Sequence, residues 1–233
     1  MLAANEANTE LLSKAQKAVS GGDFDLALNL LEPLVNQPQN SQDNQDNIEA
    51  LYLSAVCHRY LRDMPAAFEK LKQIQKQAPE LGRAVQEEAH IYRDMGENQA
   101  ALNAYQRACA LNPALHASWS NQAKLHNAFG NSAAAAEAQA QATYFLALPQ
   151  LLQSATHLLY EGKLSRAEKL CRAHLQEHPK DTDGIRILAE IASRFGIMED
   201  AEFLLESAVS FAPEDDRLRL DYIDILRKRQ KFS

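Results

Sequence analysis

The sequence of 233 residues repeats one spacing of glycine, alanine and proline along most of its length. An alanine follows the glycine by five positions, and a proline follows that alanine by twelve. Three copies hold all three residues, at Gly96-Ala101-Pro113, Gly162-Ala167-Pro179 and Gly196-Ala201-Pro213. A repeat of fixed period constrains the fold strongly, because each unit must pack on its neighbours to bury its apolar surface.

Three further copies keep part of this spacing. Arg62 takes the place of the glycine before Ala67 and Pro79, and the other two copies start from Gly22 and Gly130. These anchors predict a single array over residues 1–233, with repeats at 8–47, 48–81, 82–115, 116–147, 148–181, 182–215 and a partial one at 216–233. The extra length of the first repeat falls in residues 36–47, which are rich in Gln, Asn and Asp and predict an exposed loop.

Apolar residues recur at helical spacing on both sides of each glycine, so each repeat predicts two antiparallel helices. Small residues occupy positions eight and twenty, where two helices can cross closely only without bulky side chains. These positions hold Ala15, Ala55, Ala89, Ala123, Ala155 and Ala189 in the first helices, and Ala27, Ala67, Ala101, Ala135, Ala167 and Ala201 in the second helices. The glycine suits a turn with positive φ, and the proline ends the second helix.

This combination resembles the tetratricopeptide repeat, a 34-residue helix–turn–helix unit. Trp119 at position four of the fourth repeat and Tyr92 at position eleven of the third match aromatic positions of that family. The resemblance implies an all-α, right-handed superhelical α-solenoid that works as a non-catalytic scaffold for protein–protein interaction. An unrelated helical bundle is the alternative fold.

A second resemblance covers residues 159–179, 184–196, 200–206 and 219–227. These segments are similar to the repeat region that precedes the catalytic domain in bacterial tetratricopeptide-repeat sulfotransferases. The resemblance implies an alternative function, in which the chain positions substrate for a sulfotransferase domain beyond residue 233. The partial seventh repeat fits a chain cut within its array, while a natural capping helix is the other interpretation.

The composition narrows the classes of partner. With 24 Lys and Arg against 31 Asp and Glu, the net charge is −7, which disfavours nucleic acid as a partner. An RNA-binding helical repeat is also disfavoured, because the single tryptophan offers little base stacking. The sequence has neither an apolar stretch of membrane-spanning length nor a secretory signal, so we expect no membrane partner and a cytoplasmic location.

Motifs that could carry chemistry have simpler structural interpretations. Gly162-Lys163-Leu164-Ser165 lacks the upstream glycine of a phosphate-binding loop. Cys171, His174 and His178 lie on one helical face and could bind zinc, although the first two occupy positions that normally pack between helices. Asp181 or Thr182 is expected to cap the following helix. We therefore expect no catalytic residue, no metal and no cofactor, and the three cysteines are expected to pack in the interior.

The resemblance places partner contacts on the first helices of the repeats, at positions two, five, nine and twelve. In repeats two to four, these positions and the adjoining position six give Tyr52, Arg59, Gln86, His90, Arg93, Ser120, Asn121, Lys124 and Asn127. Our hypothesis is that Arg59, Arg93, Lys124 and Asn127 bind an acidic peptide or partner segment. The alternative is a polar surface with no partner. Lys124 and Asn127 are three residues apart instead of four, so the chaperone-tail clamp of some family members is not predicted.

The partial seventh repeat predicts a second contact surface. Its single helix should leave Leu218, Tyr222 and Leu226 uncovered, because no second helix follows within the chain. This exposed last helix suggests a dimer.

Overall fold

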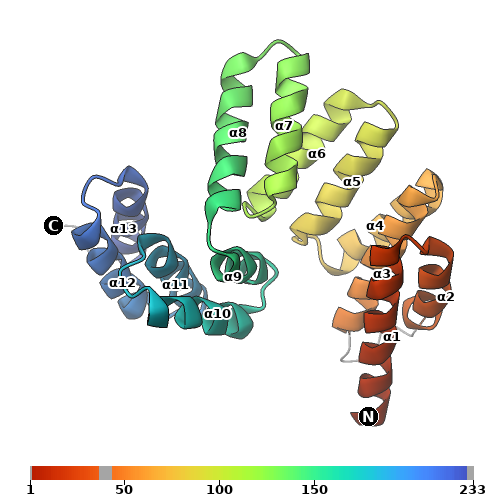
Figure 1. The fold of residues 1–233 in the computed structure, drawn as a ribbon, viewed down its shortest axis with the longest axis horizontal. Coiled ribbons are helices and arrows are strands. Elements are labelled where there is room, and N and C mark those ends of the chain that lie inside the picture. Colours follow the sequence, from red (N-terminus) through yellow and green to blue (C-terminus); the bar gives the residue numbers. More distant parts are fainter. Residues whose placement is uncertain (1, 37–43, 230–233) are drawn as a thin grey trace. The chain divides into compact units, whose positions relative to one another are not determined.

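The computed structural model describes residues 2–36 and 44–229, which form thirteen α-helices and no strand (Figure 1). The helices are α1 (Leu2–Gly21), α2 (Phe24–Val35), α3 (Asn44–Tyr60), α4 (Met64–Gln77), α5 (Gly82–Asp94), α6 (Asn98–Leu111), α7 (His116–Ala128), α8 (Ser132–Ala147), α9 (Gln150–Tyr160), α10 (Leu164–Glu177), α11 (Thr182–Arg194), α12 (Met198–Phe211) and α13 (Asp216–Lys228). The predicted all-α class with helix–turn–helix repeats is confirmed. None of these helices is both long enough and apolar enough to cross a membrane.

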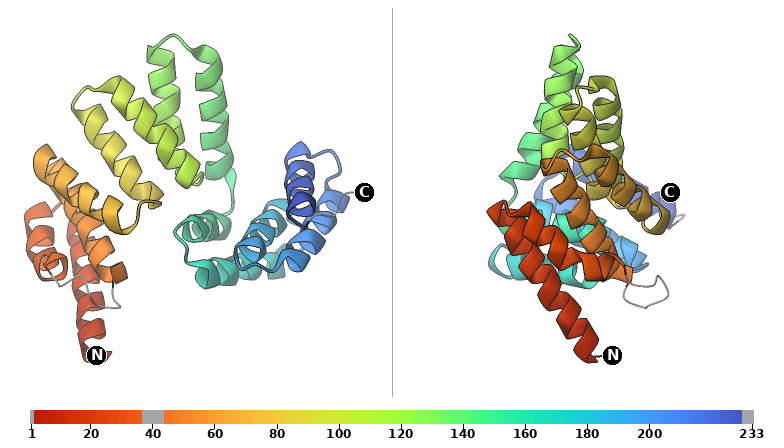
Figure 2. Two further views of the ribbon diagram at one scale, coloured as in Figure 1. Left: turned by 180° about the vertical axis from the view of Figure 1, so that it is seen from behind. Right: turned by 90° about the vertical axis from the view of Figure 1, so that its right-hand side faces the viewer.

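The chain divides into two compact units. Unit 1 contains Met1–Leu111 and Asn121–Ala135, and unit 2 contains Asn112–Ser120 and Ala136–Ser233. Within each unit, consecutive helices pair in antiparallel fashion, as with α5 and α6 in unit 1 or α11 and α12 in unit 2 (Figures 1 and 2).

The repeat spacing places its alanines as expected. All twelve alanines at positions eight and twenty are buried, and none is more than 4% exposed. Their small side chains let the two helices of a repeat approach closely, which a larger residue would prevent. Helix bounds also follow the repeats, since α5, α7, α11 and α13 begin at residues 82, 116, 182 and 216.

The turn between the two helices of a repeat uses the left-handed backbone conformation. Gly96 has φ +81°, and the amide of the next residue donates to the carbonyl of Tyr92 over 2.9 Å. Gly22, Gly130, Gly162 and Gly196 also have positive φ. Arg62, in the glycine position of repeat two, adopts φ 65° and is the non-glycine residue with positive φ among those described. The predicted turns are therefore confirmed, and Arg62 carries the conformational strain of a side chain in this region.

The predicted cap of α11 is confirmed, whereas the predicted loop before α3 is partly wrong. Asp181 caps α11 by accepting a hydrogen bond from the amide of Gly184 over 2.9 Å, as predicted. The loop expected over residues 36–47 is wrong in its last part, because α3 begins at Asn44. The side chain of Asn47 donates to the carbonyl of Leu34 over 2.9 Å, so this first turn of α3 is held against the end of α2. Residues 37–43 lie outside the described part of the chain.

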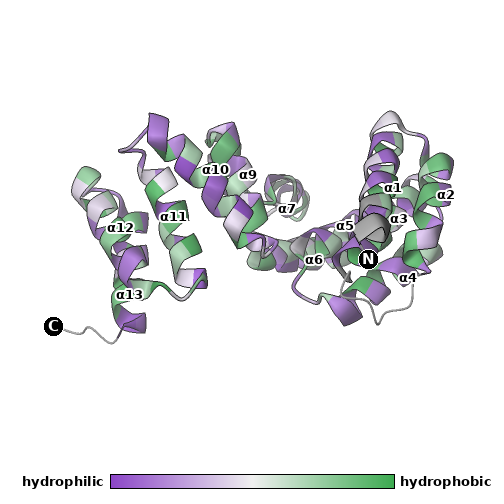
Figure 3. Ribbon diagram, turned by 90° about the horizontal axis from the view of Figure 1, so that it is seen from below, coloured by the Kyte–Doolittle hydropathy of each residue, from purple (hydrophilic) through white to green (hydrophobic). Residues whose placement is uncertain are grey.

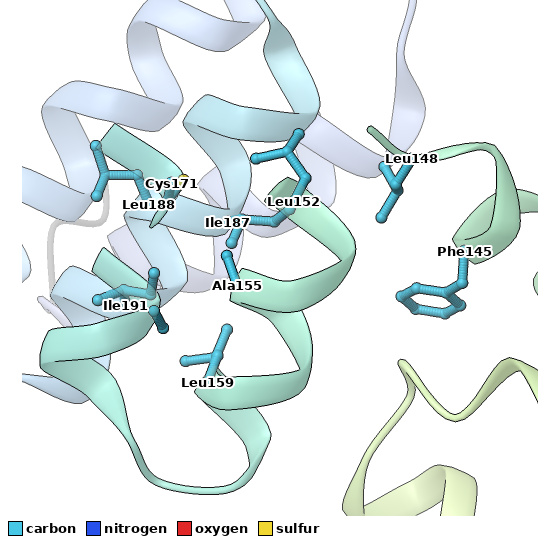
Figure 4. Packing of buried hydrophobic residues seen from close by; sticks show 10 residues of the cluster. Phe145, Leu148, Leu152, Ala155, Leu159, Cys171, Ile187, Leu188 and Ile191 are labelled. Carbon is cyan, nitrogen blue, oxygen red and sulfur yellow. The ribbon is translucent and has the colours of Figure 1, made fainter. Parts of the chain in front are cut away.

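Each unit has its own apolar core, and some helices contribute more than one side to it, as α11 does through the consecutive buried residues Ile187, Leu188 and Ala189. In Figure 3 apolar and polar segments alternate along the helices, as expected for amphipathic helices packed on one side. In unit 2, Leu152, Ala155 and Leu159 of α9 lie against Ile187 and Ile191 of α11 (Figure 4). These aliphatic contacts fix the spacing of α9 and α11, which line the pocket described below.

The last helix packs on α12 through a different face from the one predicted. Leu218 is 1% exposed and Ile225 is 4% exposed, and Tyr222 is partly buried against α12. Leu226 is partly buried as well. The expectation that Leu218, Tyr222 and Leu226 lie on an uncovered face is therefore wrong. The exposed apolar residues of α13 are Leu220 and Ile223.

Candidate functional site

Arg59, one of the predicted partner-binding residues of unit 1, is buried. Its side chain forms ion pairs with Glu87 and, over 3.0 Å, with Asp94, both on α5. Arg59 is 8% exposed and Glu87 is 4% exposed. The assumption that Arg59 faces solvent is wrong, because α3 and α5 pack closely enough for the guanidinium to bridge two carboxylates.

The neighbouring Arg93 and His90 also interact within the protein. Arg93 donates to Asp94 over 2.8 Å. The His90 ring and the Tyr105 hydroxyl share a hydrogen bond of 2.6 Å. Burial lowers the pKa of His90 to about 4, and the nearby positive charges of Arg93 and Arg59 add to this shift. His90 is therefore neutral at physiological pH and adds no positive charge to this surface.

The other predicted residues differ in exposure. Lys124 and Asn127 are exposed, whereas Tyr52, Gln86, Ser120 and Asn121 are partly buried. The guanidinium of Arg83 lies 4.4 Å from the centre of the Tyr52 ring. Ser120 belongs to unit 2 and the other eight residues to unit 1. Among the predicted residues of unit 1, Lys124 is thus the positively charged residue that is exposed.

A pocket of about 500 Å³ lies within unit 2. Its walls come mainly from α8 and from α9, α11 and α13, the first helices of repeats five to seven. Its polar and aromatic lining includes Gln141, Tyr144, Tyr160, Arg186, Glu190, Arg217, Asp221, Asp224 and Lys228. The volume falls in the range of pockets that bind ligands.

Tyr144 organises one wall of this pocket. Its hydroxyl donates to Asp183 and accepts from Arg186, each over 2.6 Å. The guanidinium of Arg217 lies 4.6 Å from the centre of the Tyr144 ring. Burial raises the pKa of Tyr144 to about 12, and the positive charge of Arg186 opposes this shift. The phenol therefore stays protonated and holds α8 against α11.

The carboxylates of the pocket are neutralised within the protein. Their partners are Arg186 for Asp221 at 3.4 Å, Arg194 for Glu190 at 2.9 Å and Arg227 for Asp224 at 3.7 Å. Burial raises the pKa of Asp221, and Arg186 opposes this rise. In contrast, no residue in the described part of the chain forms an ion pair with Lys228. Arg217 uses Nε and one terminal nitrogen on Asp215, so its other terminal nitrogen keeps its donors. Lys228 and Arg217 therefore keep unused hydrogen-bond donors in this pocket.

The sequence holds a signal for this pocket. The positional rule that selected repeats two to four also selects Arg186 and Glu190 in repeat six and Arg217 and Asp224 in repeat seven. Tyr144 lies on a second helix, so that rule does not find it.

The residues considered for zinc make other contacts. The Cys171 thiol donates to the carbonyl of Gly184 over 3.1 Å, and His174 shares a hydrogen bond of 2.9 Å with Asp181. In the described residues, no group of three or more His, Cys, Asp or Glu side chains is arranged to hold a metal ion. Cys171 and His174 instead join α10 to the start of α11.

Comparisons with known proteins support the repeated helical fold. Residues 87–147 match the family described as tetratricopeptide repeat. A crystal structure of a tetratricopeptide repeat protein from Parabacteroides merdae is similar at 17% identity, with 97% of this chain and 88% of that chain covered and a TM-score of 0.50. A structure of PilF from Pseudomonas aeruginosa is similar at 14% identity, with 96% and 98% covered and a TM-score of 0.53.

These similarities concern the fold. A search of curated protein sequences gives no match. Neither structure is described as a sulfotransferase, and that resemblance stays a prediction. Residues 87–147 thus match the tetratricopeptide repeat family, and the described part of the chain has the all-helical fold of paired antiparallel helices.

Proposed function

We propose that this protein is an interaction scaffold whose unit 2 pocket binds an extended segment of a partner protein. The observation that carries the proposal is the pocket of about 500 Å³ between α8, α9, α11 and α13. Its aromatic walls suit apolar side chains, and its unused donors suit carbonyl and carboxylate oxygens. No reacting group is required for this function.

The charges favour an acidic segment. Glu190 and Asp221 are already paired with arginines within the protein, so they do not need a cationic partner. Lys228 and the unused donors of Arg217 remain to bind a carboxylate through charge-assisted hydrogen bonds. We therefore keep the prediction of an acidic partner and propose that its main binding site lies in unit 2.

The walls of the pocket are held before a partner arrives. Tyr144 connects α8 to α11 through Asp183 and Arg186, and the α9–α11 contacts are aliphatic. A binding surface that is already ordered loses little conformational entropy on association.

The exposed polar residues of unit 1 form a second candidate site for the same partner class. Lys124 and Asn127 would contribute there, together with the half-buried Arg93. The sulfotransferase alternative has no support from the described residues, and the coding sequence beyond Ser233 tests it.

The experiment selects peptides from a random display library on the 233-residue chain and measures their binding by fluorescence polarisation. We expect Lys228→Glu to weaken the selected peptides about tenfold, because it replaces a charge-assisted hydrogen bond by repulsion. Lys124→Glu is the matched control, with the same charge change on an exposed lysine of unit 1.

The outcome assigns the site. Loss with Lys228→Glu alone supports the unit 2 pocket, and loss with Lys124→Glu alone moves the site to unit 1. Selection of no peptide, or equal binding by both variants and the wild type, refutes the proposal.

A further inference from the structure

The side of α13 that points away from α12 carries two exposed apolar residues. Leu220 is 62% exposed and Ile223 is 42% exposed, whereas Leu218 and Ile225 on the opposite side are buried. Successive residues of a helix are rotated by about 100°. Asp216, Leu220, Ile223 and Arg227 therefore form one stripe along α13, which we call the α13 seam.

The charges around the α13 seam are arranged symmetrically in sequence. Asp216 and Arg219 lie on one side of the Leu220–Ile223 centre, and Asp224 and Arg227 lie on the other. Suppose that a second α13 lies antiparallel to the first and that the centres of the two helices coincide. Each residue is then level with the residue of the other copy that lies equally far from the centre, on the opposite side in sequence. Asp216 of each copy then faces Arg227 of the other, at both ends of the contact. Leu220 of each copy is level with Ile223 of the other.

We propose that the α13 seam binds a second copy of itself in antiparallel orientation, giving a symmetric dimer. A two-fold interface must be complementary to itself, and the order of charges along α13 meets that condition. A parallel pair would instead place Asp216 against Asp216 and Arg227 against Arg227. This inference does not depend on the proposed function of the pocket.

The charged side chains of the α13 seam are exposed and can contact a second copy. The side chains of Asp216 and Arg227 are 83% and 67% exposed, and their ion pairs with Arg219 and Asp224 lie on the helix surface. Such exposed pairs contribute little to the monomer and can rearrange at low cost. A contact limited to one helix is small, so we expect a weak dimer with a dissociation constant of about 10–100 µM at low salt.

The experiment is sedimentation equilibrium of the 233-residue chain from about 5 to about 500 µM at low salt. We expect reversible dimerisation, which Leu220→Glu abolishes by placing charge at the centre of the contact. Phe203→Glu is the matched control, because Phe203 is an apolar residue of α12 that is 69% exposed and lies outside the α13 seam. Circular dichroism checks that each variant remains helical.

A charge exchange tests the orientation. Asp216→Arg alone and Arg227→Asp alone each bring like charges together at both ends of the dimer, and each should raise the dissociation constant at least about fivefold. An equimolar mixture of the two variants restores an opposite pair at both ends. We expect this mixture to associate about as tightly as the wild type.

Three results overturn the proposal. They are a wild-type chain that stays monomeric at every concentration, a dimer that Leu220→Glu leaves intact, and a mixture of the two charge variants that associates no better than either alone. The first would leave the α13 seam to another partner, and the second would place the dimer contact elsewhere.

Discussion

Replacing Arg59 by methionine tests whether this arginine is structural or available to a partner. Arg59 is 8% exposed and contacts Glu87 and Asp94. Methionine fills much of the same volume but removes the charge. Glu87, itself 4% exposed, would then be a buried carboxylate without its main cation, whereas Asp94 would keep Arg93.

Breaking one partner of a buried ion pair costs about 3–5 kcal/mol, because the remaining charge is desolvated without compensation. Arg107→Met is the matched control, since Arg107 pairs with Glu88 but its side chain is 55% exposed. Loss of such an exposed pair costs about 0–1 kcal/mol. Arg59→Met/Glu87→Leu should recover most of the loss, since it removes both buried charges.

The loss from Arg59→Met should also depend on pH. Burial raises the pKa of Glu87, and the guanidinium of Arg59 opposes this shift. Without Arg59, the pKa of Glu87 rises further above its value in the unfolded chain. The folded state then binds more protons than the unfolded state, so stability falls as pH rises. We expect the loss to be greatest near neutral pH and to decrease as the pH falls from about 7 to about 5.

The assay is urea denaturation followed by circular dichroism at several pH values. A loss below about 1 kcal/mol for Arg59→Met, equal to that of Arg107→Met, would refute the reasoning. So would a loss that does not change with pH. Arg59 would then have to be considered again as a partner-binding residue.

Two further predictions concern the repeat turns and the buried thiols. Arg62 has φ 65°, so Arg62→Gly should stabilise the chain by about 0.5–1 kcal/mol, and Gly96→Ala should destabilise it by about the same amount. Shifts of the thermal midpoint test this pair, and equal signs would contradict the role of positive φ. Burial raises the pKa of Cys57 to about 11 and that of Cys171 to about 12. Both thiols should therefore react with Ellman's reagent at pH about 8 only after unfolding, and rapid labelling of the folded chain would contradict this.

The sequence by itself determined the helical repeat of this protein. The positions of Ala89, Ala101 and Gly96 follow from requirements that act within one repeat, namely close helix crossing and a turn with positive φ. These requirements depend on residues less than one repeat apart, and they recur at a fixed period. Because these requirements recur with the repeat, they can be recognised in a single sequence. The structure confirms the paired helices, the buried alanines and the positive-φ turns.

Only the tertiary structure decided which polar residues are available. Arg59 meets Glu87 and Asp94, which are 28 and 35 residues away on another helix. The pocket of unit 2 combines side chains from α8, α9, α11, α12 and α13, and the buried side of α13 depends on how that helix sits on α12. A position within the repeat specifies which side of a helix a residue occupies. It does not specify whether a charge on the next helix has already paired with it, because that depends on packing between repeats.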